Sequence, residues 1–277
     1  MHRIPAANTT CDEQAETDTP AAGLTRREAL RCAALGGVAA ATGAAALPAA
    51  AQQAGTAKLA EITEVTAEGV EVVTGKRMVV RFDGKRCIHT RVCVLRQPEV
   101  FKANVKGPWI DPDAADAEEV ADVSRNCASG AITHTRLDGG PQEAAPRINT
   151  VTVREDGPYA FRADLSIDGR PDGFRATLCR CGASANKPYC DSSHKKVKFT
   201  ATGEPPTQDS QPLAQRGGQL LIEPQKDGPL QVTGNLEITA GSGRTTDRVA
   251  GALLCRCGAS ANKPYCDGSH ERIGFKT

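Results

Sequence analysis

The apolar positions of the chain change their spacing several times, and each change predicts a different element. Residues 70–82 alternate valine and other apolar side chains around a glycine-containing turn, which predicts a β-hairpin. Further along, Val120 and Val123 share one side of a helical period, and Asp113 precedes it as a capping residue. We therefore predict a helix over residues 114–125 with one apolar side.

A second pattern occurs twice in the C-terminal half of the chain. A Gly-Pro pair at Gly157 and again at Gly228 is followed by alternating apolar residues over 159–167 and 230–238. Repetition of this kind indicates two copies of one β-rich unit.

The first 51 residues have the layout of a leader rather than of a folded domain. They begin with a polar stretch that we expect to be disordered, and Arg26-Arg27 then precede a weakly apolar run over 32–47. This order is typical of a secretory signal peptide, and the paired arginines resemble the twin-arginine type, which implies export to the periplasm. The alternative is an uncleaved membrane anchor, but a run rich in Ala and Gly is poorly suited to spanning a bilayer.

Composition narrows the classes of function. The chain of 277 residues has one Trp, three Tyr and six Phe, so its cores need additional support from cysteines or metals. Its 34 Lys and Arg balance 33 Asp and Glu, which gives no bulk electrostatic case for nucleic acid or a membrane surface. We find no Gly-rich phosphate loop and no hydrolytic triad, and we therefore expect no enzyme activity.

The cysteines that follow the leader form three groups of three. They are Cys87, Cys93 and Cys127; Cys179, Cys181 and Cys190; and Cys255, Cys257 and Cys266. An odd total argues against a complete disulfide framework, and no cysteine is left over if each triplet holds one metal site.

The second and third triplets belong to a repeated motif that ends in a histidine. Cys179 and Cys181 are separated by one residue and can chelate one iron, whereas Cys190 and His194 are four apart and can share a second iron. This spacing predicts a 2Fe-2S cluster with three Cys ligands and one His ligand. The second copy supplies the same set: Cys255, Cys257, Cys266 and His270. Structural zinc is the alternative for three Cys and one His, although zinc ligands usually come as two well-separated pairs.

The repeated motif, Cys-x-Cys-x2-Ser-x3-Pro-x-Cys-Asp-Gly-Ser-His, resembles the signature of the CDGSH iron–sulfur family over residues 148–277. The first copy departs from it once, with Ser192 in place of Gly. The resemblance implies two β-rich domains, over 148–199 and 217–277, that form a pseudo-symmetric pair within one monomer. We consider four residues as outer contacts of the clusters, with loop and cap chemistry as the alternative for each. They are Ser184, Asp191, Ser260 and Asp267.

The first triplet resembles the ligand frame of the divergent mono-cluster 4Fe-4S domains, over residues 76–136. The resemblance implies a small ferredoxin-like α+β domain, so that the whole chain is α+β. The place of a middle ligand holds Thr90 with His89 beside it, and Ala128 replaces the Pro that commonly follows the last cysteine. The site is therefore expected to hold a 4Fe-4S cluster with His89 or a non-protein fourth ligand, or a 3Fe-4S cluster. The alternative is that the three cysteines are buried core residues.

Three turn-rich or polar segments separate the predicted domains, and we expect them to be linkers. They cover residues 52–75, 137–147 and 200–216.

Three clusters in one chain favour an electron-transfer protein that works with redox partner proteins. A protein that transfers its cluster, or that senses redox state or pH, is the alternative from another class. A structural zinc-binding module is a third. No stable membrane span and no nucleic-acid partner are expected once the leader is removed.

One prediction concerns the histidine ligand. An imidazole leaves less negative charge on a cluster than a thiolate does, and it can be displaced from iron by a proton. His270→Cys should therefore lower the reduction potential of the second repeat's cluster and make that cluster more resistant to acid. Redox titration and absorbance decay at acidic pH measure both effects. Unchanged values would contradict this role of His270.

Overall fold

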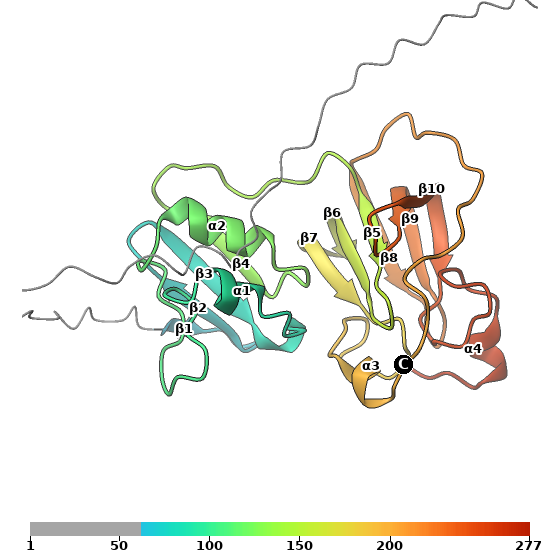
Figure 1. Cartoon of the computed structure of the whole chain (residues 1–277), viewed down its shortest axis with the longest axis horizontal. Helices are drawn as coiled ribbons and strands as arrows, with labels where there is room; N and C mark the ends of the chain where they lie inside the picture. Colours follow the sequence, from blue (N-terminus) through green and yellow to red (C-terminus); the bar gives the residue numbers. More distant parts are fainter. Residues whose placement is uncertain (1–61) are drawn as a thin grey trace, which may run out of the picture. The chain divides into compact units, whose positions relative to one another are not determined.

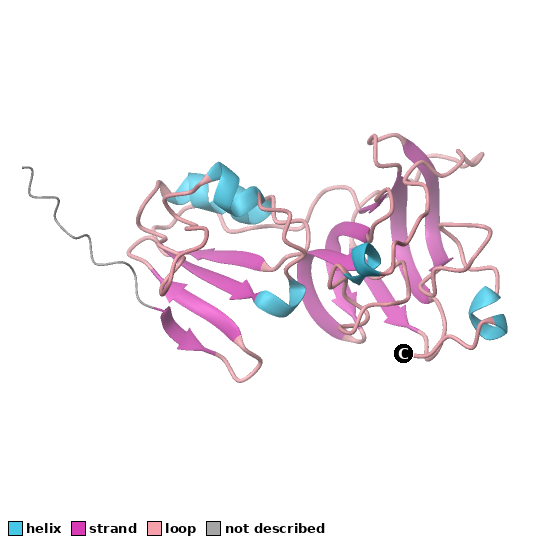
Figure 2. Ribbon diagram, turned by 60° about the horizontal axis from the view of Figure 1, so that its bottom comes forward, coloured by secondary structure: helices cyan, strands magenta, loops and turns pink. Residues whose placement is uncertain are grey.

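The computed structural model describes residues 62–277, and strands dominate them (Figure 2). One antiparallel sheet and one mixed sheet together contain ten strands, and the helical segments in this part of the chain are short. The α+β class predicted from the sequence is consistent with this content. The described residues all belong to one compact unit.

The first sheet has four antiparallel strands in the order β1-β2-β3-β4. Their bounds are Ile62–Val65, Val70–Thr74, Met78–Asp83 and Ile132–Arg136. Strands β2 and β3 form the hairpin that the alternating residues predict. Strands β1 and β2 both lie within residues 52–75, which were expected to be a linker. They belong to the sheet instead, because β1 pairs with β2 and β2 pairs with β3.

A helix, α2 (Ala117–Arg125), packs against this sheet (Figure 1). Its buried Val120 and Val123 join one core with Met78 and Val80 of the sheet, as the apolar side of the predicted helix requires. The predicted start was three residues too early. Asp116 is the N-cap, whereas Asp113 accepts a hydrogen bond from the backbone N–H of Lys76 at 2.8 Å and holds the β2–β3 turn.

The connection between β3 and α2 contains two short helical segments, a 3-10 turn η1 (Gly84–Arg86) and α1 (Val92–Arg96). Two cysteines of the first triplet lie in this connection: Cys87 directly follows η1, and Cys93 lies within α1.

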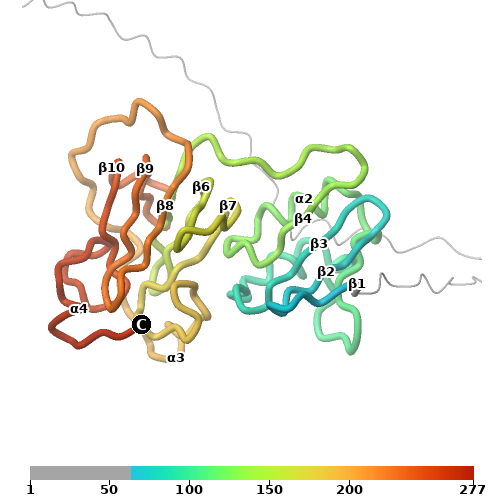
Figure 3. The backbone as a smooth tube through the Cα atoms, turned by 180° about the vertical axis from the view of Figure 1, so that it is seen from behind, coloured from blue at the N-terminus to red at the C-terminus, as the bar shows by residue number. Residues whose placement is uncertain are grey.

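The second sheet is built from six strands, three from each repeat (Figure 3). The first repeat supplies β5, β6 and β7, and the second supplies β8, β9 and β10. Their bounds are Thr150–Val153, Tyr159–Ile167, Arg170–Leu178, Gln219–Pro224, Leu230–Thr239 and Thr245–Leu254. Strands β6 and β9 match the two alternating segments, while β5, β7, β8 and β10 were not predicted.

Two of these strands, β5 and β8, connect the repeats to each other. Strand β5 pairs antiparallel with β6 of its own repeat and parallel with β9 of the other repeat. Strand β8 does the same in reverse, antiparallel with β9 and parallel with β6. The registers correspond as well, since Val151 lies opposite Phe161 and Ile238, and Ile222 lies opposite Val232 and Ile167.

The apolar faces of these strands share one core. It includes Val151 and Phe161 from the first repeat and Ile222 and Leu236 from the second, all of them fully buried. Burial of apolar area is the main favourable term in folding, so each repeat depends on the other for its stability.

The predicted leader lies outside the described residues. Within residues 62–277, no helix has both the length and the apolar character needed to cross a bilayer.

A buried amide fixes the crossing between the repeats and generates a stability prediction. Asn149 is fully buried, and its Nδ2 donates to the carbonyl oxygens of Gly218 and Asn235, each at 2.9 Å. Asn149→Ala leaves both acceptors without this donor, which should cost about 2 kcal/mol of the free energy of unfolding. Urea denaturation followed by circular dichroism measures the change. Thr233→Ala, at an exposed position of β9, is the control, and an equal midpoint for the two variants would refute this role.

Candidate metal centres

Each repeat places its ligand loop at the end of its last strand. Cys179 directly follows β7, and its N–H donates to the carbonyl oxygen of Pro188 at 2.8 Å. Cys190 then donates to the carbonyl oxygen of Thr177 at 2.9 Å, so the loop folds back along the strand. The second repeat is built in the same way, with Cys255 bonded to Pro264 at 2.9 Å and Cys266 bonded to Leu253 at 2.8 Å.

This turn brings the ligands of the first repeat together as two pairs. The sulfur atoms of Cys179 and Cys181 lie 3.8 Å apart, and the Sγ of Cys190 lies 3.5 Å from Nδ1 of His194. Ligands of one tetrahedral metal are separated by roughly 3.8 Å for two sulfurs and roughly 3.6 Å for sulfur and nitrogen, given usual bond lengths. Each pair is therefore spaced to bind one metal.

The second repeat has the same two pairs. Its distances are 3.8 Å between the sulfurs of Cys255 and Cys257, and 3.3 Å from Cys266 Sγ to His270 Nδ1. Within residues 62–277, no three or more His, Cys, Asp or Glu side chains are grouped around a single ion position.

Backbone N–H groups point at the thiols in both repeats. Cys181 and Cys190 accept from Ala183 and Ser192, each at 3.4 Å. In the second repeat, Ala259 and Gly268 donate to Cys257 and Cys266 at 3.5 Å. Such donors stabilise thiolates, which are the form that binds metal.

The four residues considered as outer contacts have defined positions in the loops. Ser184 Oγ donates to the carbonyl oxygen of Tyr189 at 2.7 Å and accepts from the N–H of Asn186 at 3.0 Å. Ser260 makes the same contacts with Tyr265 at 2.6 Å and Asn262 at 3.0 Å. Both serines therefore hold the shape of the loop.

The two aspartates tie the loop to the one-turn helices α3 (Ser193–Lys196) and α4 (Ser269–Arg272), which carry the histidines. Asp191 accepts from the N–H of Ala185 at 2.8 Å and of Ser193 at 2.9 Å. Although burial acts in the opposite direction, these bonds lower the pKa of Asp191 to about 2.

Asp267 makes the corresponding bonds, to Ser269 at 2.9 Å and to Ala261 at 2.8 Å, and they lower its pKa well below the usual range. Neither aspartate is the N-cap residue of its helix. The N-cap positions are instead Ser192 and Gly268, with φ of 69° and 81°.

Two buried arginines lie between the paired cysteines, and sequence reasoning did not single them out. Arg180 is 1 % exposed and donates to the carbonyl oxygens of Gly157, Thr202, Arg154 and Ala201. The equivalent Arg256 is 3 % exposed and stacks on Phe275. The repeated triplet Cys-Arg-Cys was a signal that could have identified both.

The ligand loops of the two repeats also touch each other. A Cβ atom added at Gly182 would lie 2.6 Å from the carbonyl oxygen of Cys257, and one added at Gly258 would lie 2.8 Å from that of Cys181. Both glycines also have positive φ. Glycine is therefore required at each position for two reasons, the lack of space for a Cβ atom and the backbone conformation. Tyr159 adds a further link, because its hydroxyl donates to Cys255 and Pro264 of the second repeat at 3.0 and 2.9 Å.

The first triplet lines a separate cavity. Cys87, Cys93, Cys127 and His89 all face a cavity of about 380 Å³, whose remaining wall includes Trp109. The structure thus brings together all of the residues that the sequence predicts for this site.

The distances within this site resemble those of the repeats. His89 Nδ1 lies 3.7 Å from Cys87 Sγ, and the N–H of Ile132 donates to Cys127 Sγ at 3.4 Å. His89 has a positive φ of 55°.

Burial makes several of the candidate ligand thiols harder to deprotonate. Burial raises the pKa of Cys87 and Cys93, and it raises that of Cys190 to about 11. Metal binding to these side chains must therefore release protons. All nine cysteines of the described region are free thiols, as the odd total suggests.

Comparison with known families agrees with the donor sets. Residues 145–195 and 227–271 match a family described as iron-binding zinc finger, CDGSH type. Residues 73–136 match a family described as divergent 4Fe-4S mono-cluster. No curated protein matches the chain.

These findings define an iron–sulfur protein. More specifically, the chain carries two CDGSH-type domains preceded by a divergent mono-cluster 4Fe-4S domain, which confirms both resemblances seen in the sequence.

A prediction follows from the loop contacts of Asp267. Asp267→Ala removes the acceptor of two backbone N–H groups, which should cost about 1–2 kcal/mol and loosen the turn that carries His270. The visible absorbance should then disappear faster in the presence of a chelator. Glu223→Ala, at an exposed position of β8, is the control, and equal rates for both variants would exclude the predicted role.

Proposed function

We propose that this protein transfers electrons, and that each CDGSH domain holds one 2Fe-2S cluster. The arrangement of ligands as two pairs per loop carries this proposal. A pair of thiolates for one iron and a thiolate with an imidazole for the other is the set that a two-iron cluster needs, whereas one zinc ion would take all four ligands at once.

The ligands in the first CDGSH domain are Cys179, Cys181, Cys190 and His194. Those in the second are Cys255, Cys257, Cys266 and His270.

The N-terminal domain holds a 4Fe-4S or a 3Fe-4S cluster on Cys87, Cys93 and Cys127. Three thiols and His89 around one cavity support this assignment, with His89 as a candidate fourth ligand. The apolar wall formed by Phe82, Trp109 and other side chains would limit the access of water.

The two CDGSH domains act as a pseudo-symmetric pair, and the N-terminal domain adopts a ferredoxin-like fold. The reciprocal pairing of β5 and β8 and the mutual contact of Gly182 and Gly258 support the pair. The CDGSH domains have bounds of 148–199 and 217–277, and the N-terminal domain extends beyond the expected 76–136 to include β1 and β2.

An iron–sulfur cluster, when bound, supplies the exchange of single electrons. The protein's own residues hold charge and exclude water around it. Arg180 and Arg256 bring buried positive charge to loops rich in thiolates, which favours the more negative, reduced state. The two arginines also fix the entrance of each loop through bonds to backbone carbonyls.

Transfer of the cluster to another protein, or sensing of redox state or pH, is a second candidate function. The partial exposure of His194 and His270 favours it, because a ligand that reaches the surface is the easiest to displace. Comparing the rate of cluster transfer to an apo-acceptor with the rate of electron exchange with a ferredoxin reductase separates the two functions.

The setting of this function is also a proposal. A twin-arginine-like leader supports export to the periplasm. Its partners there would be redox proteins. The protein would act as a monomer, because the two CDGSH domains of one chain already form the pair.

Iron and sulfide counts combined with EPR test the cluster assignment. We expect about seven or eight irons per chain, from two 2Fe-2S clusters and one 3Fe-4S or 4Fe-4S cluster. About four irons would remove the N-terminal cluster from the proposal. A colourless protein containing zinc would refute it as a whole.

A further inference from the structure

An ion pair joins the N-terminal domain to the first CDGSH domain. Arg86 immediately precedes Cys87, and its guanidinium binds both oxygens of Asp172 in β7, at 3.2 and 2.9 Å. The two side chains are only 15 % and 11 % exposed. A bidentate pair shielded from water to this degree fixes both distance and orientation.

The same carboxylate also holds the ligand loop of the first CDGSH domain. Tyr189 donates its hydroxyl to Asp172 at 2.6 Å, and the ring of Tyr189 lies 4.7 Å from the guanidinium of Arg86. Tyr189 immediately precedes Cys190. One cluster of three side chains thus connects the neighbours of Cys87 and Cys190.

The single departure from the CDGSH motif lies at this interface. Ser192 adopts a φ of 69°, which costs a non-glycine residue some strain, and its hydroxyl donates to the carbonyl oxygen of Ile88 at 3.4 Å. Nearby, Asn186 Nδ2 donates to the carbonyl oxygen of Lys85 at 2.8 Å. Both bonds run between the ligand loop of one domain and the ligand loop of the other.

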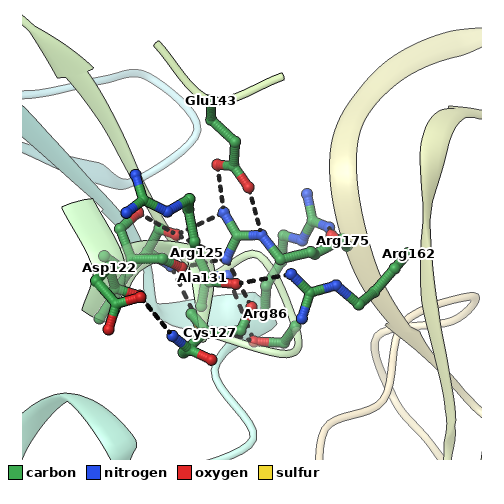
Figure 4. A network of polar contacts seen from close by, with 12 residues as sticks. Arg86, Asp122, Arg125, Cys127, Ala131, Glu143, Arg162 and Arg175 are labelled. Carbon is green, nitrogen blue, oxygen red and sulfur yellow. Dashed lines mark hydrogen bonds and ion pairs between the residues drawn. The ribbon is translucent and has the colours of Figure 1, made fainter. Parts of the chain in front are cut away.

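A second buried arginine holds the other ligand segment of the N-terminal domain (Figure 4). Arg175 of β7 is 2 % exposed and donates to the carbonyl oxygen of Cys127 at 2.7 Å and to that of Ser124. Glu143 pairs with its guanidinium at 2.9 and 2.7 Å. The segment that carries Cys127 is therefore fastened to the first CDGSH domain as well.

The two histidines of the neighbouring sites face a common space. His89 and His194 line one cavity of about 200 Å³, together with Ser192 and Lys195.

The second CDGSH domain keeps the local chemistry but lacks the interdomain contacts. Tyr265 bonds to Asp247 as Tyr189 does to Asp172, yet within residues 62–277 no side-chain cation binds Asp247. The position of Ser192 is Gly268, and the place of Arg175 in the strand is taken by Gly251. Ser192 and Arg175, which are replaced by glycine in the second domain, are thus residues through which the first domain contacts the N-terminal domain.

We propose that the N-terminal site passes electrons directly to the site of the first CDGSH domain, and that Arg86, Asp172 and Ser192 position the two ligand loops for this transfer. The inference rests on the proposed function. One electron enters the N-terminal centre from an external low-potential donor of the ferredoxin or flavodoxin class. That centre is then oxidised as the centre of the first CDGSH domain is reduced, and no bond or proton is exchanged.

The direction of transfer depends on the reduction potentials of the two centres. The imidazole of His194 leaves the CDGSH centre with less negative charge and a higher potential than thiolate ligation would. With His89 as its fourth ligand the N-terminal centre would have the same donor set of three thiolates and one imidazole, so the measured potentials of the two centres establish the direction of transfer.

The test uses the loaded full chain and less than one reducing equivalent of photoreduced deazaflavin. Freeze-quench EPR follows how fast the signal of the reduced N-terminal centre is replaced by that of a CDGSH centre. Asp172→Asn leaves Arg86 buried without its charged partner, which should favour separation of the loops by about 100-fold and slow the transfer accordingly. Asp247→Asn makes the same change beside Tyr265 and should leave the rate as in the parent chain.

Iron and sulfide counts and the potential of each centre are measured on the same samples. Intact clusters with equal transfer rates in Asp172→Asn and Asp247→Asn would overturn the inference while leaving the proposed function in place. A parent chain without clusters would instead refute the proposed function.

If the Asp172→Asn variant loses its N-terminal cluster, the Ser192→Gly variant tests the proposal instead. It introduces the residue of the second domain, retains the backbone conformation and removes only the bond to Ile88. Slower transfer with unchanged potentials supports the positioning role, and an unchanged rate refutes it. Asp247→Asn, which leaves the contact between Ser192 and Ile88 in place, is again the control and should not affect transfer from the N-terminal centre.

Discussion

The exchange of strands between the two CDGSH repeats is the constraint on which the rest of the structure depends. Because β5 and β8 each pair with strands of both repeats, the last strands β7 and β10 are fixed relative to one another. Each ligand loop begins where one of these strands ends, so the sheet decides where the metal sites lie. The contact between Gly182 and Cys257 is a direct result of that placement.

Buried arginines recur wherever a ligand loop meets another segment. Arg180 and Arg256 hold the loops of the repeats, and Arg86 and Arg175 hold the interface with the N-terminal domain. A guanidinium has five donors, so it can satisfy several backbone carbonyls at once in a tight turn. It also carries the positive charge that a group of thiolates requires, and one residue type thereby serves both structure and electrostatics.

The sequence predicted the local features of this protein well because their causes are local. The Cys and His spacing gave both ligand loops, and the alternation after Gly157 gave β6 with the bounds that the structure has. What it missed depends on long-range contacts. Strand β5 is short, and it pairs with β9 of the other repeat as well as with β6 of its own. Likewise, the role of Ser192 depends on its contact with Ile88, a residue about a hundred positions earlier in the chain. The helix start was misplaced because Asp113 caps no helix and instead binds the backbone of Lys76 in the hairpin turn.

The two repeats have diverged at positions that face different neighbours. Tyr159 reaches the loop of Cys255, whereas the corresponding position of the second repeat is Leu230, which has no hydroxyl to return the contact. A chain made of two second repeats would therefore lose the bonds of Tyr159, and a chain made of two first repeats would gain tyrosine and arginine groups without partners. The halves arose from one pattern but are no longer interchangeable parts.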